Sequence, residues 1–376
     1  MRKNLITKAA SKARILSGIC CNKVFQGPYQ VYVNLTDHCN LNCLMCSVYS
    51  PLVEHRVKGD EKGILKKEIL GRLSDSIVAL KVPLVTITGG GEPFLHPHLM
   101  DFVRTLTDRR KDVTVVTNGT VIKESHIPEL LERGVNLRFS LVAASPETYV
   151  EVHPNQSPAA FEKLENILAL IRDFRSKSRS RSVVSILFVI FRNNFEEIPK
   201  MLDMGSKYQM DFVHFKPAIF DHEQMKELFL DDAQLGELQN IIGSVKSTHN
   251  ISSTDLSTML GDLEQNQVRI ASPGKSHLRR SIPCYKGWTF CWILANGNVV
   301  PCCDCSVSLG NINDRPFEEI WHSEKYCEIR RRMTTLHEGA IALPGCRCDT
   351  CRPDSEEARI SRALRLVSGN SRRNPN

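Results

Sequence analysis

Short apolar runs rich in β-branched residues alternate with amphipathic helical patterns over the first 220 residues. The helical patterns place apolar residues on one face, as at Ile69, Leu73 and Ile77, and another predicted helix begins at Ser157 and Pro158. Apolar runs of this kind are typical of strands buried on both faces of a parallel sheet. They cover residues 29–35, 83–88, 112–117, 136–142, 182–191 and 210–217. Successive strand–helix units predict an open α/β barrel or a doubly wound sheet.

The composition, 41% hydrophobic and 24% charged residues among 376, is that of an ordinary globular protein of two or three domains. No run of about 18 apolar residues predicts a spanning helix. The N-terminal segment lacks the apolar core of a signal peptide, so we expect a cytoplasmic protein with an N-terminal docking helix, or else a peripheral membrane contact. The net charge of +7 is spread along the chain, and the basic run at 172–182 predicts a solvated helix end rather than a nucleic-acid patch.

Fourteen cysteines without a secretion signal indicate metal or redox chemistry rather than disulfides. Nine of them lie between Cys284 and Cys351, three lie near residue 40, and Cys20 and Cys21 belong to no motif. This uneven distribution predicts two metal-binding regions, separated by a long segment that contains no cysteine.

The first region holds Cys39, Cys43 and Cys46, spaced C-x₃-C-x₂-C directly after the first predicted strand. Structural zinc sites are usually closed by four ligands, and cubane iron–sulfur clusters by four cysteines. A loop with three thiolates therefore leaves one metal position for a ligand that is not protein. Because ligands gather at the carboxyl ends of parallel strands, we expect this loop at the functional edge of the sheet.

The second predicted strand leads into the sequence GGGEP, in which three glycines precede Glu92. The glycines expose backbone amides and let a ligand approach, and the carboxylate suits an ammonium group. The loop lacks the Lys and Ser/Thr of a phosphate-binding loop, which argues against a nucleoside triphosphate. Small polar groups also end the third and fourth strands, although turn chemistry alone would explain them. The residues expected to bind a cofactor at this edge are Gly89, Gly90, Gly91, Glu92, Thr117, Asn118 and Ser140.

Together the segments CNLNCLMC and GGGEP, with Ser140, resemble the radical S-adenosylmethionine superfamily over roughly residues 29–220. The resemblance implies a partial (β/α)₆ barrel in which Cys39, Cys43 and Cys46 bind three irons of a [4Fe–4S] cluster. S-adenosylmethionine would chelate the fourth iron and give a 5′-deoxyadenosyl radical that takes a hydrogen atom from the substrate. An external one-electron donor such as flavodoxin or ferredoxin would supply the electron. One departure from the family pattern is Met45, where the family commonly has an aromatic residue. The alternative interpretation of the three-cysteine loop is a zinc site.

In the second region, the spacing C-x₁₂-G-x₄-C over Cys284, Gly297 and Cys302 resembles the opening of SPASM and twitch domains of this superfamily. The segment 309–333 resembles those domains too. No cysteine follows Cys351, whereas full SPASM domains carry further cysteines that bind a second cluster. The resemblance therefore favours the shorter twitch arrangement, with one auxiliary [4Fe–4S] cluster on Cys284, Cys302, Cys348 and Cys351. A zinc-ribbon interaction module is the rival interpretation of this region.

Five cysteines of this region have no assigned role. Cys291 and Cys346 could replace one of the auxiliary ligands, and Cys327 is expected to be a buried apolar residue on a helix. Cys303 and Cys305 adjoin a proposed ligand. They are candidate hydrogen donors or ligands of a second auxiliary cluster, and packing alone would also explain them.

The predicted organisation has five parts: an N-terminal arm, the barrel, a helical linker, the auxiliary-cluster domain and a basic tail. Their ranges are 1–28, 29–225, 226–280, 281–352 and 353–376.

The single-cluster pattern resembles that of aminocyclitol dehydrogenases. It predicts hydrogen abstraction from a small sugar- or aminocyclitol-like substrate in a natural-product or surface-glycan pathway, followed by oxidation or epimerisation. Maturation of a ribosomal peptide is the alternative, although only 38 residues precede Cys39, too few for a peptide-recognition domain within the chain. A non-catalytic iron–sulfur partner protein is disfavoured because the cofactor motifs are complete.

Overall fold

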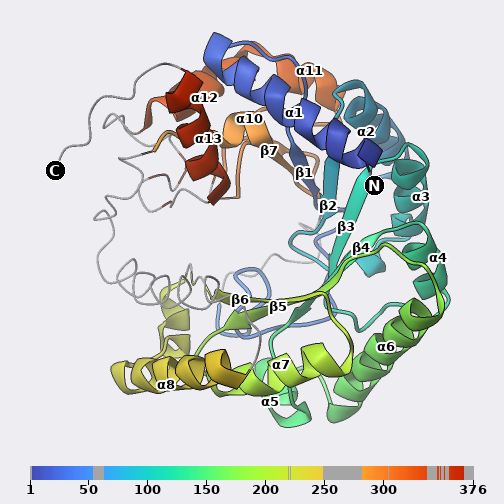
Figure 1. Cartoon of the computed structure of the whole chain (residues 1–376), viewed down its shortest axis with the longest axis vertical. Coiled ribbons are helices and arrows are strands. Elements are labelled where there is room, and N and C mark those ends of the chain that lie inside the picture. The colour runs from blue at the N-terminus through green and yellow to red at the C-terminus, as the bar shows by residue number, and fades with distance from the viewer. Residues whose placement is uncertain are drawn as a thin grey trace.

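A single curved sheet forms the centre of the computed structural model, and helices cover its outer, convex face (Figure 1). The structure describes residues 2–53, 63–218, 220, 222–248, 282–303, 305–336, 345–346, 348, 351 and 355–367. Six parallel strands follow one another across the sheet in chain order. They are β1 (Gln30–Val33), β2 (Leu84–Ile87), β3 (Asp112–Thr117), β4 (Asn136–Leu141), β5 (Val184–Ile190) and β6 (Phe212–Pro217). The predicted α/β class and all six predicted strands are confirmed.

The helices that connect these strands pack their apolar faces against the sheet. In α3, for example, Leu99, Phe102, Val103 and Leu106 are buried, which is the spacing of one helical face. The connecting helices are α2 (Lys67–Ala79), α3 (Leu99–Asp108), α4 (His126–Glu132), α5 (Pro146–Val152), α6 (Pro158–Lys177) and α7 (Ile198–Lys207), and α8 (Asp232–Thr248) follows β6. The helix predicted to begin at Ser157 and Pro158 is confirmed, with Ser157 as the N-cap residue.

The cysteine-rich C-terminal region extends the same sheet. Strand β7 (Phe290–Ile293) pairs in parallel with β1, and the short β8 (Val299–Val300) pairs with β7 in the antiparallel sense. The strand order is therefore β6-β5-β4-β3-β2-β1-β7-β8. Three helices accompany these strands: α10 (Lys286–Thr289), α11 (Phe317–His322) and α12 (Glu324–Thr334). The Trp321 indole donates to the carbonyl of Gln26 at 3.0 Å and fixes α11 to the segment before β1.

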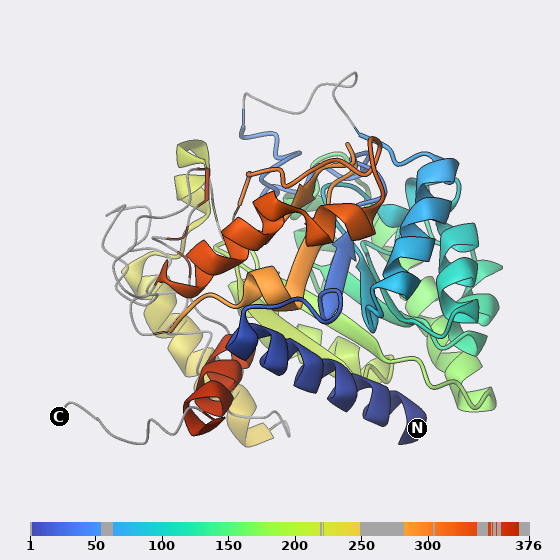
Figure 2. The same cartoon turned by 90° about the horizontal axis from the view of Figure 1, so that it is seen from above.

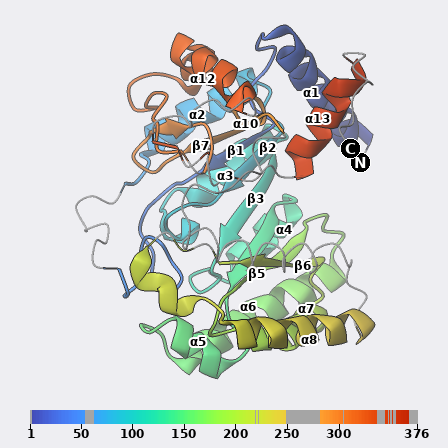
Figure 3. The same ribbon diagram turned by 90° about the vertical axis from the view of Figure 1, so that its left-hand side faces the viewer.

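The two ends of the described chain lie side by side as helices. The N-terminal helix α1 (Arg2–Cys21) contacts α10 and α13 (Ser355–Val367), and Figures 2 and 3 show it running past the C-terminal region. The Glu357 carboxylate accepts from the backbone N–H of Tyr285 at 3.1 Å, so the segment predicted to be a basic tail contains a packed helix. Most of the predicted linker, residues 249–280, lies outside the described residues. No helix in the described part of the chain is long and apolar enough to cross a membrane.

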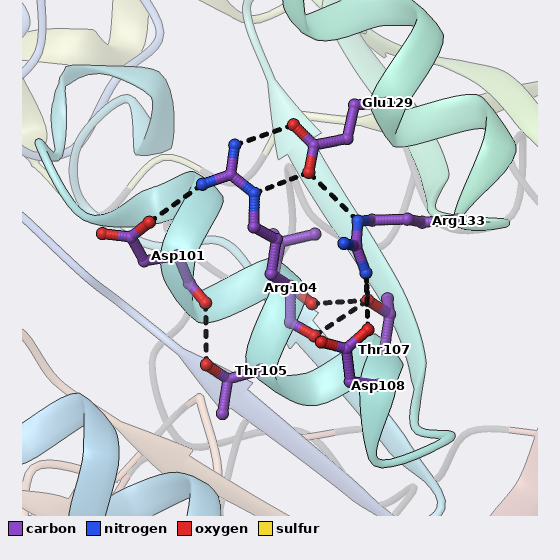
Figure 4. Close-up of polar contacts among 8 residues, drawn as sticks. Asp101, Arg104, Thr105, Thr107, Asp108, Glu129 and Arg133 are labelled. Carbon is purple, nitrogen blue, oxygen red and sulfur yellow. Dashed lines mark hydrogen bonds and ion pairs between the residues drawn. The ribbon is translucent and has the colours of Figure 1, made fainter.

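A network of charged side chains joins α3 to α4 on the outer face (Figure 4). The Arg104 guanidinium donates two hydrogen bonds to the Glu129 carboxylate, at 2.6 and 2.8 Å, and one to Asp101 at 2.9 Å. Arg133 donates to Glu129 at 3.0 Å and to Asp108 at 2.7 Å. The hydrogen bonds from Arg104 are the main cause that lowers the pKa of Glu129 to about 2.

We predict that Glu129→Gln lowers the free energy of unfolding by about 1 kcal/mol at neutral pH, because this network is partly exposed to solvent. Since folding lowers the pKa of Glu129 from 4.5 to about 2, the stabilisation is complete above about pH 4.5 and is lost as the pH falls towards 2. Urea unfolding at several pH values measures this difference. Glu132→Gln, an exposed change on the same helix, is the matched control and should have no effect; an equal loss in both variants would contradict the prediction.

Candidate functional site

The three-cysteine loop begins directly after β1 and is anchored close to that strand. The Asp37 carboxylate accepts from the Asn34 side-chain amide at 2.6 Å and from the backbone N–H of Gly63 at 3.0 Å. Further along, the Ser50 hydroxyl donates to the carbonyl of Leu44 at 2.6 Å. These bonds fix both ends of the loop, so its cysteines occupy a defined place at the carboxyl edge of the sheet.

A second set of contacts clamps the middle of this loop to the turn between α5 and α6. Asn42 and Asn155 each accept the other's backbone N–H, at 3.3 and 3.2 Å. The Asn155 amide also donates to the carbonyl of Asn40 at 2.9 Å, and the backbone N–H of Leu44 donates to the carbonyl of Val152 at 3.0 Å. Sequence reasoning missed this clamp. The only signal was the polar stretch HPNQ at 153–156, which resembles any helix–helix turn.

The glycine loop after β2 packs directly on the cysteine loop. A Cβ on Gly91 would collide with the carbonyl oxygens of His38 and Thr36, and one on Gly89 would collide with the Asn34 side chain. The φ of Gly89, +153°, also disfavours other residues. The glycines are thus required for the close approach of two loops. The role predicted for Gly89, Gly90 and Gly91 in cofactor binding stays a prediction.

Glu92 is a buried carboxylate with no cationic partner among the described residues. Its side chain is 2% exposed and accepts hydrogen bonds from the Thr117 hydroxyl (2.7 Å) and from the backbone N–H groups of Asn118 (2.7 Å) and Phe94 (3.0 Å). Burial raises the pKa of Glu92 to about 7, and these hydrogen bonds only partly offset it. An ammonium group beside Glu92 would offset the cost of burying the charge.

The loop after β3 completes the arrangement. Thr117 and Asn118, predicted as cofactor contacts, hold Glu92 in place. The Asn118 side-chain amide also donates to Asn40, between the first two cysteines, at 3.0 Å, and Asn40 donates to the Thr120 hydroxyl at 2.7 Å. The loops after β1, β2 and β3 are therefore connected by one hydrogen-bonded chain. Ser140 lies in β4 next to the end of that strand, as predicted, and is partly exposed; its role in cofactor binding stays a prediction.

The three thiols lie close enough to influence one another. Burial raises the pKa of Cys39 and Cys43, and the charge of Cys46 raises both further. The Cys46 sulfur accepts from the backbone N–H of Tyr49 at 3.3 Å. Among the described residues no three Cys, His, Asp or Glu side chains converge as ligands of a single ion would. A cubane needs no such convergence, because each cysteine binds a different iron, so the donor set fits an iron–sulfur cluster.

In the C-terminal region the four predicted auxiliary ligands come from three segments, since Cys348 and Cys351 are close in the sequence. Cys284 is buried just before α10, and its backbone N–H donates to the carbonyl of Met333 at 3.1 Å. Cys302 follows β8, and Cys348 and Cys351 are partly exposed. Between Cys284 and Cys302 the chain turns at Gly297, where φ is +87° and a Cβ would collide with Asn311 and Asn313. This explains why the motif requires glycine there.

The remaining cysteines correct part of the sequence analysis. Cys305 and Cys346 form a disulfide, contrary to the expectation of free thiols, because a β-bridge pairs their two segments. While that bond is present, Cys305 has no thiol hydrogen to donate, which leaves Cys303, an exposed residue, as the predicted hydrogen donor. Cys291 is buried within β7, and burial raises its pKa to about 12. The prediction that Cys327 is buried is wrong: it lies on α12 but is partly exposed.

We predict that Glu92→Gln weakens S-adenosylmethionine binding at least tenfold, because the amide cannot offset the charge of the cofactor's ammonium group. In the wild-type protein, protonation of Glu92 below about pH 7 should lower the affinity by up to tenfold per pH unit, with a plateau above pH 7. Anaerobic equilibrium binding at several pH values measures both effects. Glu124→Gln, an exposed carboxylate in the segment after β3, is the control, and unchanged binding in Glu92→Gln would refute the assignment.

Comparisons with known proteins agree with this geometry. The Radical SAM superfamily model matches residues 33–205, and the SPASM model, an iron-sulfur cluster-binding domain, matches residues 284–352. The AdoMet-dependent heme synthase of Methanosarcina barkeri is 25% identical over 327 residues, covering 83% of this chain and 86% of that protein. The PqqA peptide cyclase of Xanthomonas euvesicatoria pv. vesicatoria is 23% identical over 339 residues, covering 85% and 83%.

Among solved structures, SuiB of Streptococcus suis superposes with a TM-score of 0.61 at 16% identity, covering 84% of this chain and 70% of SuiB. Such a likeness supports the fold: a partial barrel whose sheet continues into the C-terminal domain. The family matches establish the cofactors as S-adenosylmethionine, its [4Fe–4S] cluster and auxiliary iron–sulfur binding in the C-terminal domain. The chain belongs to the radical SAM superfamily and is an enzyme with a C-terminal SPASM iron–sulfur domain.

Proposed function

We propose that this enzyme is an oxidoreductase that removes a hydrogen atom from a hydroxyl-bearing carbon of a small sugar- or aminocyclitol-like substrate. The observation that carries the radical chemistry is the buried Glu92 carboxylate beside the three-cysteine loop, which has no cationic partner in the part of the chain that the structure describes. A reductant is required, and we propose an external one-electron carrier such as flavodoxin or ferredoxin. When bound, S-adenosylmethionine and its cluster would supply a 5′-deoxyadenosyl radical, and the auxiliary cluster would accept the second electron of an oxidation.

The chain's own residues hold and orient these groups. We propose that Cys39, Cys43 and Cys46 bind the first cluster and that the Glu92 carboxylate binds the cofactor's amino group. Since Thr117 and Asn118 donate to Glu92 and Asn118 also reaches Asn40, the carboxylate and the cysteine loop keep a fixed relation. Fixed positioning of this kind is the protein's main contribution when a cofactor carries the chemistry.

The cysteine inventory of the C-terminal domain supports oxidation with one auxiliary cluster. The Cys305–Cys346 disulfide withdraws two thiols from the possible ligands, which favours the set Cys284, Cys302, Cys348 and Cys351. The same bond leaves Cys303 as the thiol proposed to return a hydrogen atom in an epimerisation. Because two thiols are held in the disulfide, one auxiliary cluster is favoured over two. For the same reason an oxidation is favoured over an epimerisation, which needs a thiol as hydrogen donor.

Peptide maturation is the second candidate function. It is favoured by the PqqA peptide cyclase, whose similarity extends over most of both chains. Anaerobic incubation with S-adenosylmethionine, a reductant and panels of sugars and peptides distinguishes the two. Oxidation of a sugar-like compound supports the first proposal, and a cross-linked or cyclised peptide supports the second.

We predict that the anaerobically reconstituted protein binds about eight irons, as two clusters of the four-iron type. Replacing Cys39, Cys43 and Cys46 by Ala should remove about four irons and abolish cofactor cleavage. Replacing the exposed Cys20 and Cys21, which belong to no motif, is the control and should remove none. Cleavage that persists in the triple variant would refute the ligand assignment, and about twelve irons in the wild type would show a second auxiliary cluster.

The fate of the substrate hydrogen gives a further prediction. In deuterated water, an oxidation should yield a product without deuterium at the reacting carbon, because no hydrogen atom returns to it. An epimerisation would introduce deuterium through an exchangeable thiol, and Cys303→Ala should then abolish the label. Mass spectrometry of the product measures this. If deuterium appears at the reacting carbon and is absent from the product of Cys303→Ala, the enzyme catalyses an epimerisation and the proposed oxidation is wrong.

A further inference from the structure

A cavity of about 520 Å³ lies at the end of the sheet opposite the cysteine loop. Its lining includes the segment just before β1 and Trp288, just before β7, whereas the three cysteines follow β1. Because β1 and β7 run parallel, this is the amino edge of both strands. The cavity is therefore separate from the proposed active site, and its size is within the range of small-molecule sites.

The lining of this cavity is positively charged. Lys23, Arg330 and Arg331 line it together with His322, Trp288 and Cys327, and no lining residue that the structure describes is acidic. Burial lowers the pKa of His322 and the charge of Arg330 lowers it further, whereas the charge of Glu318, outside the lining, raises it. The positive charge of Arg330 therefore acts on the His322 side chain.

Arg330 is the buried member of this set. Its side chain is 1% exposed, and its guanidinium lies over the rings of Trp321 and Tyr326, at 4.0 and 4.1 Å from their centroids. It donates to the carbonyls of Gly287 (2.9 Å) and Trp321 (2.7 Å) and to the Cys327 sulfur at 3.7 Å. These contacts orient the guanidinium rigidly at the wall of the cavity.

The guanidinium nevertheless has no anionic partner among the residues that the structure describes. A guanidinium has five N–H donors, and the described residues accept three of them, none through a carboxylate. Lys23 and Arg331, which are exposed, also form no ion pair with a described residue. The Trp288 indole N–H is buried without a hydrogen-bond partner in the described structure. A buried cation normally has a counter-charge, because its desolvation is costly.

We propose that this cavity binds a phosphate group, either as inorganic phosphate or as part of a phosphate ester. A phosphate oxygen could accept the remaining N–H donors of Arg330, and Lys23 and Arg331 could offset the second negative charge. The cavity has more room than inorganic phosphate needs, which would accommodate the organic part of an ester beside Trp288. This inference is independent of the proposed function.

The test is isothermal titration calorimetry of the full-length, reconstituted protein with inorganic phosphate and with ribose 5-phosphate, against chloride at equal ionic strength. We expect saturable binding of one phosphate group per chain, weakened at least tenfold in the double variant Lys23→Glu/Arg331→Glu. Both residues are exposed, so these changes should not prevent folding. Tighter binding of ribose 5-phosphate would identify the site as one for an ester, and equal binding as one for phosphate itself.

The matched control is Lys325→Glu/Arg332→Glu, which makes the same change in charge at exposed positions of α12 outside the cavity lining. Its affinity for phosphate should stay within about twofold of the wild type, since exposed charges that do not line the cavity make no direct contact with the ligand and are weakened by salt. No saturable binding, or an equal loss of affinity in both double variants, would overturn the proposal. Equal loss would mean that phosphate only responds to the overall positive charge.

Discussion

The Glu92 carboxylate is the contact on which the arrangement of the active-site edge depends. The carboxylate accepts one hydrogen bond from its own loop and two from the end of β3 and the loop after it. The backbone N–H of Glu92 donates to the carbonyl of His38 in the cysteine loop at 2.8 Å. Three loops that are far apart in the sequence are thereby held together. Because no cation of the described chain accompanies the buried carboxylate, the same residue that organises the loops also prepares a place for a positively charged ligand group.

The pairing of β7 with β1 has a comparable effect on the domain organisation. It joins the cysteine-rich C-terminal region to the sheet that carries the three-cysteine loop, with Cys291 in β7 itself. The buried Cys291 opposes Val31, so the junction between the two regions is part of the hydrophobic core. A continuous sheet transmits little relative motion, which suits two metal groups that must keep a fixed separation.

Two buried charges that have no counter-charge among the described residues lie at opposite ends of this sheet. Glu92 is negative and lies near the carboxyl end of β2, whereas Arg330 is positive and lies near the amino ends of β1 and β7. In each case hydrogen bonds to neutral groups orient the charge but do not neutralise it. A bound ligand of opposite charge would offset the cost of each, which is a common reason for a protein to retain a buried charge.

The sequence by itself determined the six parallel strands and the helices between them, because the periodicity of apolar residues is a local property. It also determined the family, since C-x₃-C-x₂-C and GGGEP are short segments of fixed spacing. Only the tertiary structure decided that Asn155 clamps the cysteine loop, that β7 joins β1, that Cys305 pairs with Cys346 and that Arg330 faces a cavity whose described lining holds no acid. Each of these depends on residues that are distant in the chain and that meet only through the packing of the whole sheet, which no local pattern records.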